Sequence, residues 1–422
     1  MKRKEYIEGS TLHGLNRAYS SSHQSEKWFW IFMIIAGLFG LTIGFSILVF
    51  KYLAYEINLE ITDRIDEDVE FPSITFCNNE RISQSYMTDE YYGYYGKHPI
   101  QSAFSDHFYE YAKKFPYFCR IFGQNCNFTE DFTTYGYHDP CITWNMKGLV
   151  AQKLPGIYHG VEMDFFLNAS ITNYTNYLHS KNTITVIMHS SNEFPSIFFD
   201  NFEIGAGVQT RIELKKRKYL RLPSPYPSKC TDINKLLDTK EVYSYTRNSC
   251  FEMCFIRQVL KDCGVVMQPR FRALIPDWMI AQYEKNVTLD EYTNCHRILK
   301  WEFFINGLGY CDCPLACNEV IYNRRIQTVP LDVEYLYSSI SQNNISLGDL
   351  DNFKKSIFSI RVYYPRLESE NAVERAAYEM SDVFNDFGGL LGLAIGASVI
   401  SVVELLAICC LTFFSKRKIN KR

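Results

Sequence analysis

The stretch Asp386-Phe-Gly-Gly-Leu-Leu-Gly-Leu-Ala-Ile-Gly-Ala-Ser-Val-Ile-Ser-Val-Val-Glu-Leu405 decides how the rest of the chain is interpreted. From Gly388 to Phe414 the sequence has 27 residues and one charge, Glu404, and this length can cross a hydrocarbon layer of roughly 30 Å as a helix. Small and polar residues fill its first half, whereas a span that only had to dissolve in lipid could consist of Leu and Val. We therefore expect a membrane span along which something packs closely or passes.

Two interpretations of this span compete. Gly392 and Gly396 form a small-xxx-small pair, which lets two helices touch backbone to backbone. The alternative is a pore, because Ser398, Ser401 and Glu404 recur at helical spacing. A carboxylate within a membrane usually faces protein or water, and small residues can free backbone carbonyls to replace the water shell of an ion. The stretch alone leaves both interpretations open.

A second apolar segment lies near the N-terminus. Trp28 to Phe50 gives 23 residues without a charge, enough for one span, and no small-residue cleavage site follows it. We therefore expect a retained signal-anchor. Lys and Arg are concentrated before this segment and in residues 415–422, where five of the eight residues are basic. By the positive-inside rule, both ends are expected to be cytoplasmic.

These segments divide the chain into five parts. We expect a cytoplasmic N-terminal tail over residues 1–27, a first span over 28–52, an extracellular cysteine-rich domain over 53–385, a second span over 386–414 and a cytoplasmic C-terminal tail over 415–422. Five Asn-x-Ser/Thr sequons favour the same side for the large domain, as candidate glycosylation sites at Asn127, Asn168, Asn173, Asn286 and Asn344.

Cysteines support an oxidising compartment. Twelve of the fourteen, from Cys77 to Cys317, lie between the two expected spans, and their even number suits disulfide bonds. Cys119 and Cys126 close a small loop, and Cys141 offers a partner for Cys77. We therefore expect a domain stiffened by covalent bridges.

The eight cysteines from 230 to 317 carry the most informative spacing. An antiparallel arrangement would nest them as Cys230–Cys317, Cys250–Cys313, Cys254–Cys311 and Cys263–Cys295. Eight cysteines allow 105 connectivities, so the pattern permits this pairing without proving it. Zinc is the alternative, but no histidine falls at ligand spacing, and we expect no metal site.

Local patterns predict a mixed α+β domain without catalytic motifs. We expect strands over 71–78, 183–189, 209–220 and 345–364, a helix over 246–259, and a connection or helix over 369–386. The basic residues of 209–220 could suggest nucleic acid, but an extracellular strand with a solvated face fits them better. No Ser-His-Asp, His-Glu-x-x-His or phosphate-loop pattern is present, so an enzyme is the least supported class.

With these pieces in place, the chain resembles the degenerin/epithelial sodium channel superfamily, which includes the acid-sensing ion channels, and its divergence suggests the insect pickpocket branch. The resemblance covers nearly the whole chain. Its motifs are His13-Gly14, Phe71-Pro-Ser-Ile-Thr-Phe-Cys-Asn78, Ile187-Met-His-Ser-Ser-Asn-Glu-Phe-Pro195, Cys311-Asp-Cys-Pro-Leu-Ala-Cys317, and Gly396-Ala-Ser398 with Glu404 six residues on.

The resemblance implies a fold and a set of site residues. The fold is a two-span membrane protein with a large disulfide-rich α+β ectodomain of palm, thumb, finger, knuckle and β-ball, in which the thumb covers residues 230–317. It assembles as a homo- or heterotrimer with related subunits. The implied site residues are the selectivity filter Gly396, Ala397 and Ser398, the pore and gate residues Asn385, Asp386, Gly389, Gly392, Ser401 and Glu404, the gating motif His13 and Gly14, and the bridges Cys77–Cys141 and Cys119–Cys126.

The implied function is that of a subunit of a trimeric, sodium-permeable, voltage-insensitive and amiloride-sensitive cation channel of the plasma membrane, gated through its ectodomain. Na⁺ is the permeant ion, no cofactor or nucleic acid is expected, and an extracellular ligand is compatible with this class. An accessory or ligand-sensing subunit that conducts poorly alone is the alternative. Where relatives dock a Trp of the thumb loop near the first span, this chain has Tyr226, with Tyr52 and Tyr55 as candidate aromatic contacts.

Overall fold

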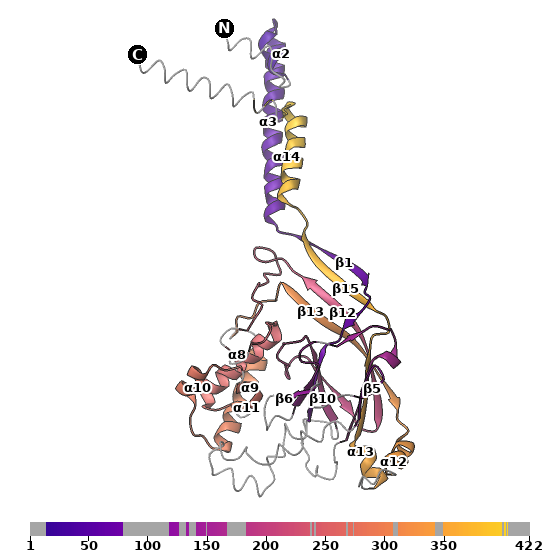
Figure 1. The fold of residues 1–422 in the computed structure, drawn as a ribbon. Helices are drawn as coiled ribbons and strands as arrows, with labels where there is room; N and C mark the ends of the chain where they lie inside the picture. Colours follow the sequence, from indigo (N-terminus) through magenta and orange to yellow (C-terminus); the bar gives the residue numbers. More distant parts are fainter. Residues whose placement is uncertain are drawn as a thin grey trace, which may run out of the picture. The chain divides into compact units, whose positions relative to one another are not determined.

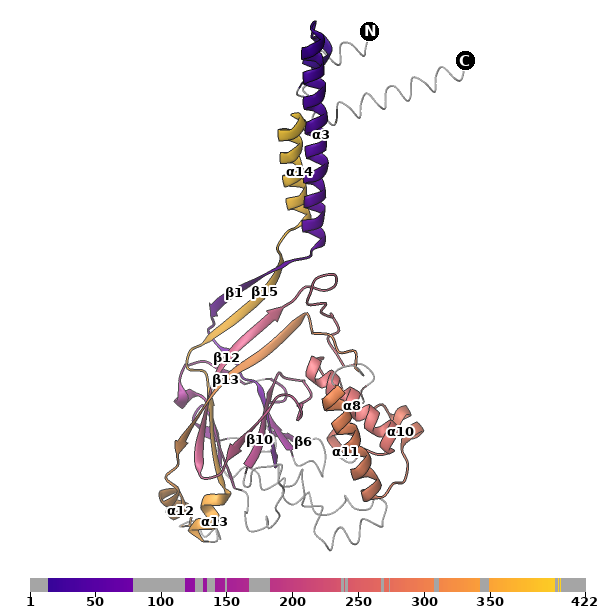
Figure 2. The same cartoon turned by 180° about the vertical axis from the view of Figure 1, so that it is seen from behind.

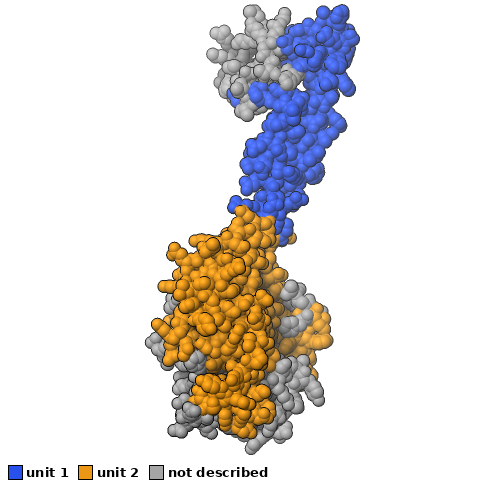
Figure 3. All heavy atoms as spheres, turned by 90° about the vertical axis from the view of Figure 1, so that its right-hand side faces the viewer, with its two compact units in different colours: residues 1–58, 224–227, 375–422 blue, residues 59–223, 228–374 orange. Residues whose placement is uncertain are grey.

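The computed structural model describes residues 14–78, 118–125, 132–134, 141–148, 150–166, 183–236, 239, 242–266, 269–272, 274–306, 311–341, 349–398, 401 and 403 (Figure 1). The chain forms two compact units, coloured separately in Figure 3. The first comprises residues 1–58, 224–227 and 375–422, and the second comprises residues 59–223 and 228–374.

Helices dominate the first unit. The short helix α2 (Leu15–Ser20) is followed by the long helix α3 (Gln24–Leu53), and α14 (Met380–Ile395) lies alongside α3 (Figures 1 and 2). Within the described part of the chain, α3 is the helix that is long and apolar enough to cross a membrane. Its apolar side chains lie mostly on the surface, as lipid-facing residues would.

The second unit is built on a large sheet centred on β12 (Val208–Leu220). Strand β13 (Asn318–Pro330) runs antiparallel to β12 over its whole length. Two strands run parallel to β12 on its other edge, one after the other, β14 (Ile357–Tyr363) and β15 (Glu368–Ala376). The sheet continues through β1 (Ile57–Ile65) on one side and through β9 (Val161–Phe166), β4 (Phe118–Ile121) and β5 (Gln124–Asn125) on the other.

A second sheet supplies the other half of the core. Its order is β11 (Asn201–Gly205), β10 (Thr183–His189), β3 (Ser73–Asn78), β7 (Cys141–Trp144) and β6 (Phe132–Thr134). A two-stranded ladder joins β2 (Val69–Glu70) to β8 (Ala151–Gln152), and the short 3-10 helix η2 spans Ile157–His159. The largest buried cluster takes side chains from both main sheets, so the hydrophobic core lies between them.

A separate helical cluster has its own core. It consists of α8 (Arg247–Cys263), α9 (Pro269–Arg272), α10 (Asp277–Tyr283) and α11 (Leu289–Asn306), which gather together in Figures 1 and 2. Thr246 caps α8, since its hydroxyl accepts the Ser249 backbone N–H, and Gly264 ends the helix in the left-handed region with φ of 77°. Two further helices, α12 (Val333–Ser341) and α13 (Leu350–Ser356), pack around Phe353.

Most of the expected strands are present, and two expectations are wrong. Residues 350–356, expected within a strand, form α13, because Asp349 caps a helix by accepting the Asn352 N–H at 2.8 Å and Phe353 is fully buried. Residues 369–376, the first part of the stretch 369–386 expected as a connection or helix, belong to strand β15. Glu370 places a charged residue at a buried position of β15, which interrupts the alternation of apolar residues that predicts a strand. The charge is tolerated there because Lys215 and Arg217 of β12 neutralise it.

Candidate functional site

The predicted filter lies at a break in the helix. Helix α14 ends at Ile395, and Gly396 takes φ of 65° and ψ of 22°, a left-handed conformation that glycine adopts without strain. The Gly396 N–H donates to the Gly392 carbonyl at 3.0 Å, and the Ala397 N–H donates to the Leu391 carbonyl at 3.3 Å. The expectation that Gly388 to Phe414 forms one unbroken helix is therefore wrong, because a glycine cap stops the helix before Ala397.

Ser398 and Ser401 close the other side of this break. The Ser398 N–H donates to the Ser401 hydroxyl at 3.2 Å, and the Ser401 N–H donates to the Ser398 hydroxyl at 3.3 Å. Reciprocal bonds between residues three apart are the capping-box pattern of a helix N-terminus. The Ser398 side chain thus caps the helical residues that follow it. Glu404 lies outside the described residues.

The glycines of α14 do not pack against α3 in this chain. A Cβ atom at Gly388, Gly389 or Gly392 would meet nothing within 4 Å. With Asn385, they recur every three or four residues and form one exposed face of α14. Within this chain, α3 therefore does not use the face of α14 that carries Gly392, and the interpretation of Gly392 and Gly396 as a helix-packing pair stays a prediction.

Glycines of α3, which none of the sequence motifs includes, make the contact between α3 and α14 instead. A Cβ atom at Gly37 would lie 2.6 Å from the Ala394 carbonyl oxygen, and one at Gly44 would lie 3.0 Å from the Leu390 side chain. Gly37 and Gly44 are seven residues apart, about two helical turns, and this spacing is the signal that could have identified them.

Asp386, expected at the mouth of a pore, is hydrogen-bonded within its own chain. The Tyr378 hydroxyl donates to the Asp386 carboxylate at 2.7 Å. The Lys51 Nζ lies 4.1 Å from the centre of the Tyr378 ring, a cation–π contact. The Ala377 N–H also donates to the Glu56 carbonyl at 2.9 Å. These bonds tie the beginning of α14 to the end of α3.

Tyr226 makes the aromatic contact expected of its loop. Its ring lies against Tyr55 with centroids 5.5 Å apart, and Tyr55 in turn contacts Tyr52 at 5.9 Å. Glu374 of β15 holds both residues that flank the loop, since it accepts the Leu222 N–H at 2.9 Å and the Ser228 hydroxyl at 2.6 Å. The base of the loop is therefore anchored to the strand that precedes α14.

The described half of the His-Gly motif is a helix cap. Gly14 has φ of 79° and begins α2, and a Cβ atom there would lie 3.2 Å from the Trp30 ring of α3. The Arg17 guanidinium lies 5.0 Å from the centre of the same ring. Gly14 is thus required both by its backbone angle and by the closeness of α3. His13 lies outside the described residues.

Five disulfides stiffen the described ectodomain. Four of them are the pairs of the expected nested arrangement, Cys230–Cys317, Cys250–Cys313, Cys254–Cys311 and Cys263–Cys295. The fifth is Cys77–Cys141, the pair that the resemblance implies. Cys126, and with it the Cys119–Cys126 bridge, lies outside the described residues.

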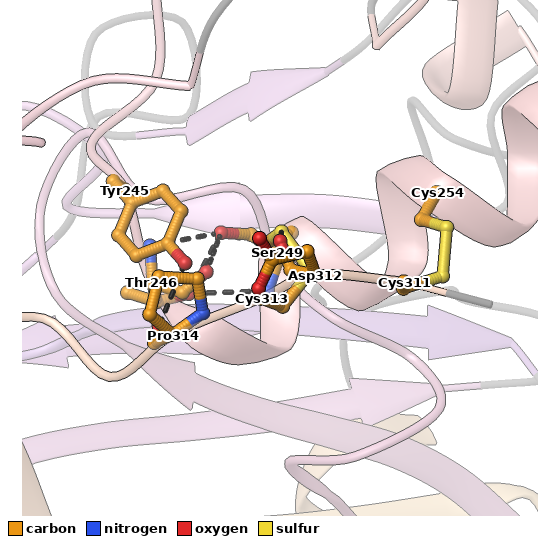
Figure 4. The surroundings of a disulfide bond; sticks show 9 residues. Tyr245, Thr246, Ser249, Cys254, Cys311, Asp312, Cys313 and Pro314 are labelled. Atoms are coloured by element: carbon orange, nitrogen blue, oxygen red, sulfur yellow. Dashed lines mark hydrogen bonds between the residues drawn. A yellow bond between two sulfur atoms is a disulfide. The ribbon is translucent and has the colours of Figure 1, made fainter. Parts of the chain in front are cut away.

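Two of these bridges attach α8 to the Cys311–Cys313 segment. Figure 4 shows the hydrogen-bonded pair Thr246 and Ser249 at the start of the helix, beside Cys313. The Tyr245 hydroxyl donates to the Pro314 carbonyl at 2.7 Å. Because these cysteines are bonded to one another, they are not zinc ligands.

Glu193, at the end of the His-Ser motif, is a buried acid. Its carboxylate accepts the Ser190 N–H at 3.0 Å. Burial raises its pKa to about 7, the Ser190 and Thr246 hydrogen bonds partly offset this rise, and the charges of Asp200 and Glu319 add to it. The carboxyl group therefore titrates near neutral pH.

Lys215 connects two carboxylates across the large sheet. Its Nζ lies 3.0 Å from Asp63 of β1 and 2.8 Å from Glu370 of β15. The hydrogen bond from Lys215 is the main cause that lowers the pKa of Glu370, with Arg217 acting in the same direction. The two bridged strands directly follow α3 and precede α14 in the chain.

One sequon lies among the described residues. Asn286 is exposed in the connection between α10 and α11, and Thr288 of the same sequon caps α11 by accepting the Glu291 N–H at 3.3 Å. Asn127, Asn168, Asn173 and Asn344 lie outside the described residues.

Comparison with known proteins agrees with these features. The family model described as amiloride-sensitive sodium channel matches residues 6–112 and 95–408. The described residues combine a disulfide-rich domain and an apolar N-terminal helix, which is consistent with a membrane channel of this family. The chain belongs to the amiloride-sensitive sodium channel family, the degenerin/epithelial sodium channel superfamily that its motifs resemble.

Similar curated proteins include sodium channels, acid-sensing ion channels and degenerins. The FMRFamide-activated amiloride-sensitive sodium channel of Cornu aspersum is 22% identical over 94% of this chain and 81% of its own length. Acid-sensing ion channel 4 of Rattus norvegicus is 24% identical over 94% of this chain and 77% of its own length. Degenerin deg-1 of Caenorhabditis elegans is 26% identical over 72% of this chain and 40% of its own length. The insect pickpocket branch stays a prediction.

Proposed function

We propose that this chain is a subunit of a trimeric, sodium-permeable, voltage-insensitive cation channel that is amiloride-sensitive and gated through its ectodomain. The observation that carries the proposal is the break after Ile395, where a glycine cap and the reciprocal hydrogen bonds of Ser398 and Ser401 leave Gly396 to Ser398 outside the helix. Non-helical backbone at membrane depth is tolerated where it is enclosed by protein or lines a water-filled path.

The break offers a cation backbone oxygen atoms that can replace the oxygen atoms of its hydration water. The last four carbonyls of a helix lack helical donors, so the end of α14 presents oxygen atoms to this segment. The C-terminus of a helix also carries a partial negative charge, which favours a cation. Gly396 and Ala397 add no bulk, so three copies could approach closely and let their carbonyls replace water around Na⁺. Ser398 acts mainly by capping the next helix.

The proposed membrane arrangement follows the two apolar segments. Residues 28–52 and 386–414 would cross the plasma membrane, with residues 1–27 and 415–422 in the cytoplasm and 53–385 outside. The open face of α14 containing Asn385, Gly389 and Gly392 would point toward the other two subunits, and Asp386 would contribute to a ring of three carboxylates at the outer mouth. Homomeric assembly and assembly with related subunits are both compatible with this arrangement.

Electrical recording tests the proposal. The chain is expressed alone and with related subunits, and cation current is measured across ligand, force and pH stimuli, with and without amiloride. We expect a sodium current whose reversal potential shifts in Ser398→Leu but not in Ser338→Leu, a control on the exposed surface of α12. Absence of current in every condition and combination would reject the channel proposal.

An accessory subunit is the second candidate, and Asn385 is the observation that favours it. This side chain is exposed on the open face of α14, at a position where the resemblance implies a small residue, so it can alter how tightly neighbouring helices close. We expect Asn385→Cys, once derivatised with a bulky thiol reagent, to hold the pore open. Large currents from the chain by itself would exclude the accessory role, whereas current only with related subunits would favour it.

A further inference from the structure

The closest approach between α3 and α14 involves a backbone atom beside the proposed filter. An ideal Cβ atom on Gly37 would lie 2.6 Å from the Ala394 carbonyl oxygen, 3.5 Å from the Ala394 carbonyl carbon and 3.7 Å from the Ile395 side chain. Real Cβ atoms essentially never lie within 3.0 Å of a non-bonded heavy atom of another part of the chain, so any larger residue at position 37 must displace its neighbour. That neighbour is main chain, which cannot rotate away as a side chain can.

The displaced group would be the last turn of α14. Ala394 precedes Gly396 by two residues, and its carbonyl belongs to the group at the helix end that lacks helical donors. The bare Cα of Gly37 permits close contact with this oxygen, of the kind that Cα–H groups make with carbonyls where helices cross. A shift of this turn would move Gly396 and the residues that follow it, because they continue directly from it.

The three glycines of α3 differ in what surrounds them. Gly44 faces the Leu390 side chain at 3.0 Å, and this flexible side chain can give way. Gly40 has nothing within 4 Å of its ideal Cβ position. An alanine at each position adds the same methyl group and the same gain in helix propensity. The three substitutions therefore form a graded series that isolates the contact with Ala394.

We propose that Gly37 is a positioning residue for ion selectivity, because its lack of a side chain sets where the end of α14, and hence Gly396 to Ser398, lies. The proposal rests on the proposed channel function. It assigns to the first apolar helix a role in selectivity through contact with the backbone of α14, without contact between Gly37 and the ion.

The experiment measures selectivity in the full-length chain, in the subunit combination that conducts. Sodium-to-potassium permeability ratios come from reversal potentials, and surface biotinylation measures the number of subunits. We expect Gly37→Ala to change the ratio at least threefold and Gly37→Val to change it more. We expect Gly40→Ala to match the unmodified chain, and Gly44→Ala to have a smaller effect that Leu390→Ala reverses.

A change in selectivity cannot come from a loss of folded protein, because the permeability ratio does not depend on the number of channels. If Gly37→Ala does not reach the surface, it is co-expressed with an excess of unmodified chain, and mixed assemblies should then show an intermediate ratio. A ratio for Gly37→Ala equal to that of Gly40→Ala, alone or in mixed assemblies, would overturn the proposal.

The contact between Gly37 and the Ala394 carbonyl is tested separately, on the full chain purified in detergent. Gly37→Ala should lower the midpoint of thermal unfolding, whereas Gly40→Ala should leave it unchanged or raise it. Equal midpoints for these two variants would reject the contact even if no current were recorded. A chain that never conducts, but in which Gly37→Ala is selectively destabilised, would reject the channel function while retaining the contact.

Discussion

The ring of Tyr226 lies nearly perpendicular to the ring of Tyr55, at an interplanar angle of 81° and with centroids 5.5 Å apart. Tyr55 follows α3, and Tyr226 is at the tip of a loop whose flanking residues are held by Glu374 of β15. One short loop is therefore connected to residues next to both helices of the first unit. Under the proposed channel function, we expect this loop to contribute to gating.

Removing this aromatic contact should weaken gating. Edge-to-face pairs contribute about 0.5–1.5 kcal/mol, so we expect Tyr226→Ala to lower single-channel open probability roughly two- to tenfold. Tyr226→Phe should retain most of the activity because it keeps the ring. Tyr55→Ala combined with Tyr226→Ala should be no worse than either single change. Additive losses in this cycle would show that the two rings act independently.

The bond between Tyr378 and Asp386 should reduce the charge that Asp386 presents to cations. Hydrogen bonds to charged groups contribute roughly 1.5–3 kcal/mol. In Tyr378→Phe the carboxylate loses this donor, so we expect external Ca²⁺ to block the current at several-fold lower concentration. Asp386→Asn should weaken the block, and the double variant should behave like Asp386→Asn. Tyr158→Phe, on a side chain that is 89% exposed, is the control; an unchanged block in Tyr378→Phe would reject this interpretation.

Lys215 should stabilise the sheet at neutral pH. Because the folded-state pKa of Glu370 is lowered, its contribution is present above its unfolded value and is lost as the pH falls through the folded value. Lys215→Met leaves Asp63 and Glu370 as like charges near one another. We expect it to lower the free energy of unfolding by about 1 kcal/mol at pH 7.4, since the lysine is partly exposed.

The loss in Lys215→Met should shrink below about pH 4, because the charge of Glu370 that Lys215 neutralises is lost as the pH falls through its lowered pKa. Thermal unfolding of the purified full chain at both pH values measures this difference. Lys355→Met, which removes only an exposed pair with Asp351, is the matched control and should change little. A deficit in Lys215→Met that is the same at both pH values would contradict the carboxylate repulsion.

Glu193 should make the folded chain less stable as the pH rises, which is the opposite of the effect of Glu370. Its pKa is raised from 4.5 to about 7, so between these values the folded chain binds more protons than the unfolded chain. The free energy of unfolding therefore falls as the pH rises through this window. Glu193→Gln should remove that slope and stabilise the chain at pH 7.5 by on the order of 3 kcal/mol.

Unfolding midpoints measured between pH 5 and pH 8 check this prediction. Glu334→Gln, on an exposed carboxyl group of α12, should retain the slope of the unmodified chain. If Glu193→Gln also keeps that slope, another group is responsible for it.

Much of the scaffold could be predicted from local patterns. The cysteine spacing on α8 and around Cys311 anticipated the pairs seen in the structure, because residues four apart on a helix lie on one face. The strands over 183–189 and 209–220 followed from alternation along the chain. The helix at 350–356 did not, since it depends on a single capping residue and on the burial of Phe353.

The sequence by itself determined the apolar helix, the family, and the small residues near Gly396, because composition, motifs and spacing are local properties of a chain. Tertiary structure decided how those residues are used. Whether a glycine contacts another helix depends on what lies opposite it, and only the fold places Ala394 against Gly37 and leaves Gly389 and Gly392 open. Likewise, the end of α14 at Gly396 and the bridge from Lys215 to Glu370 depend on backbone angles and on partners far along the chain.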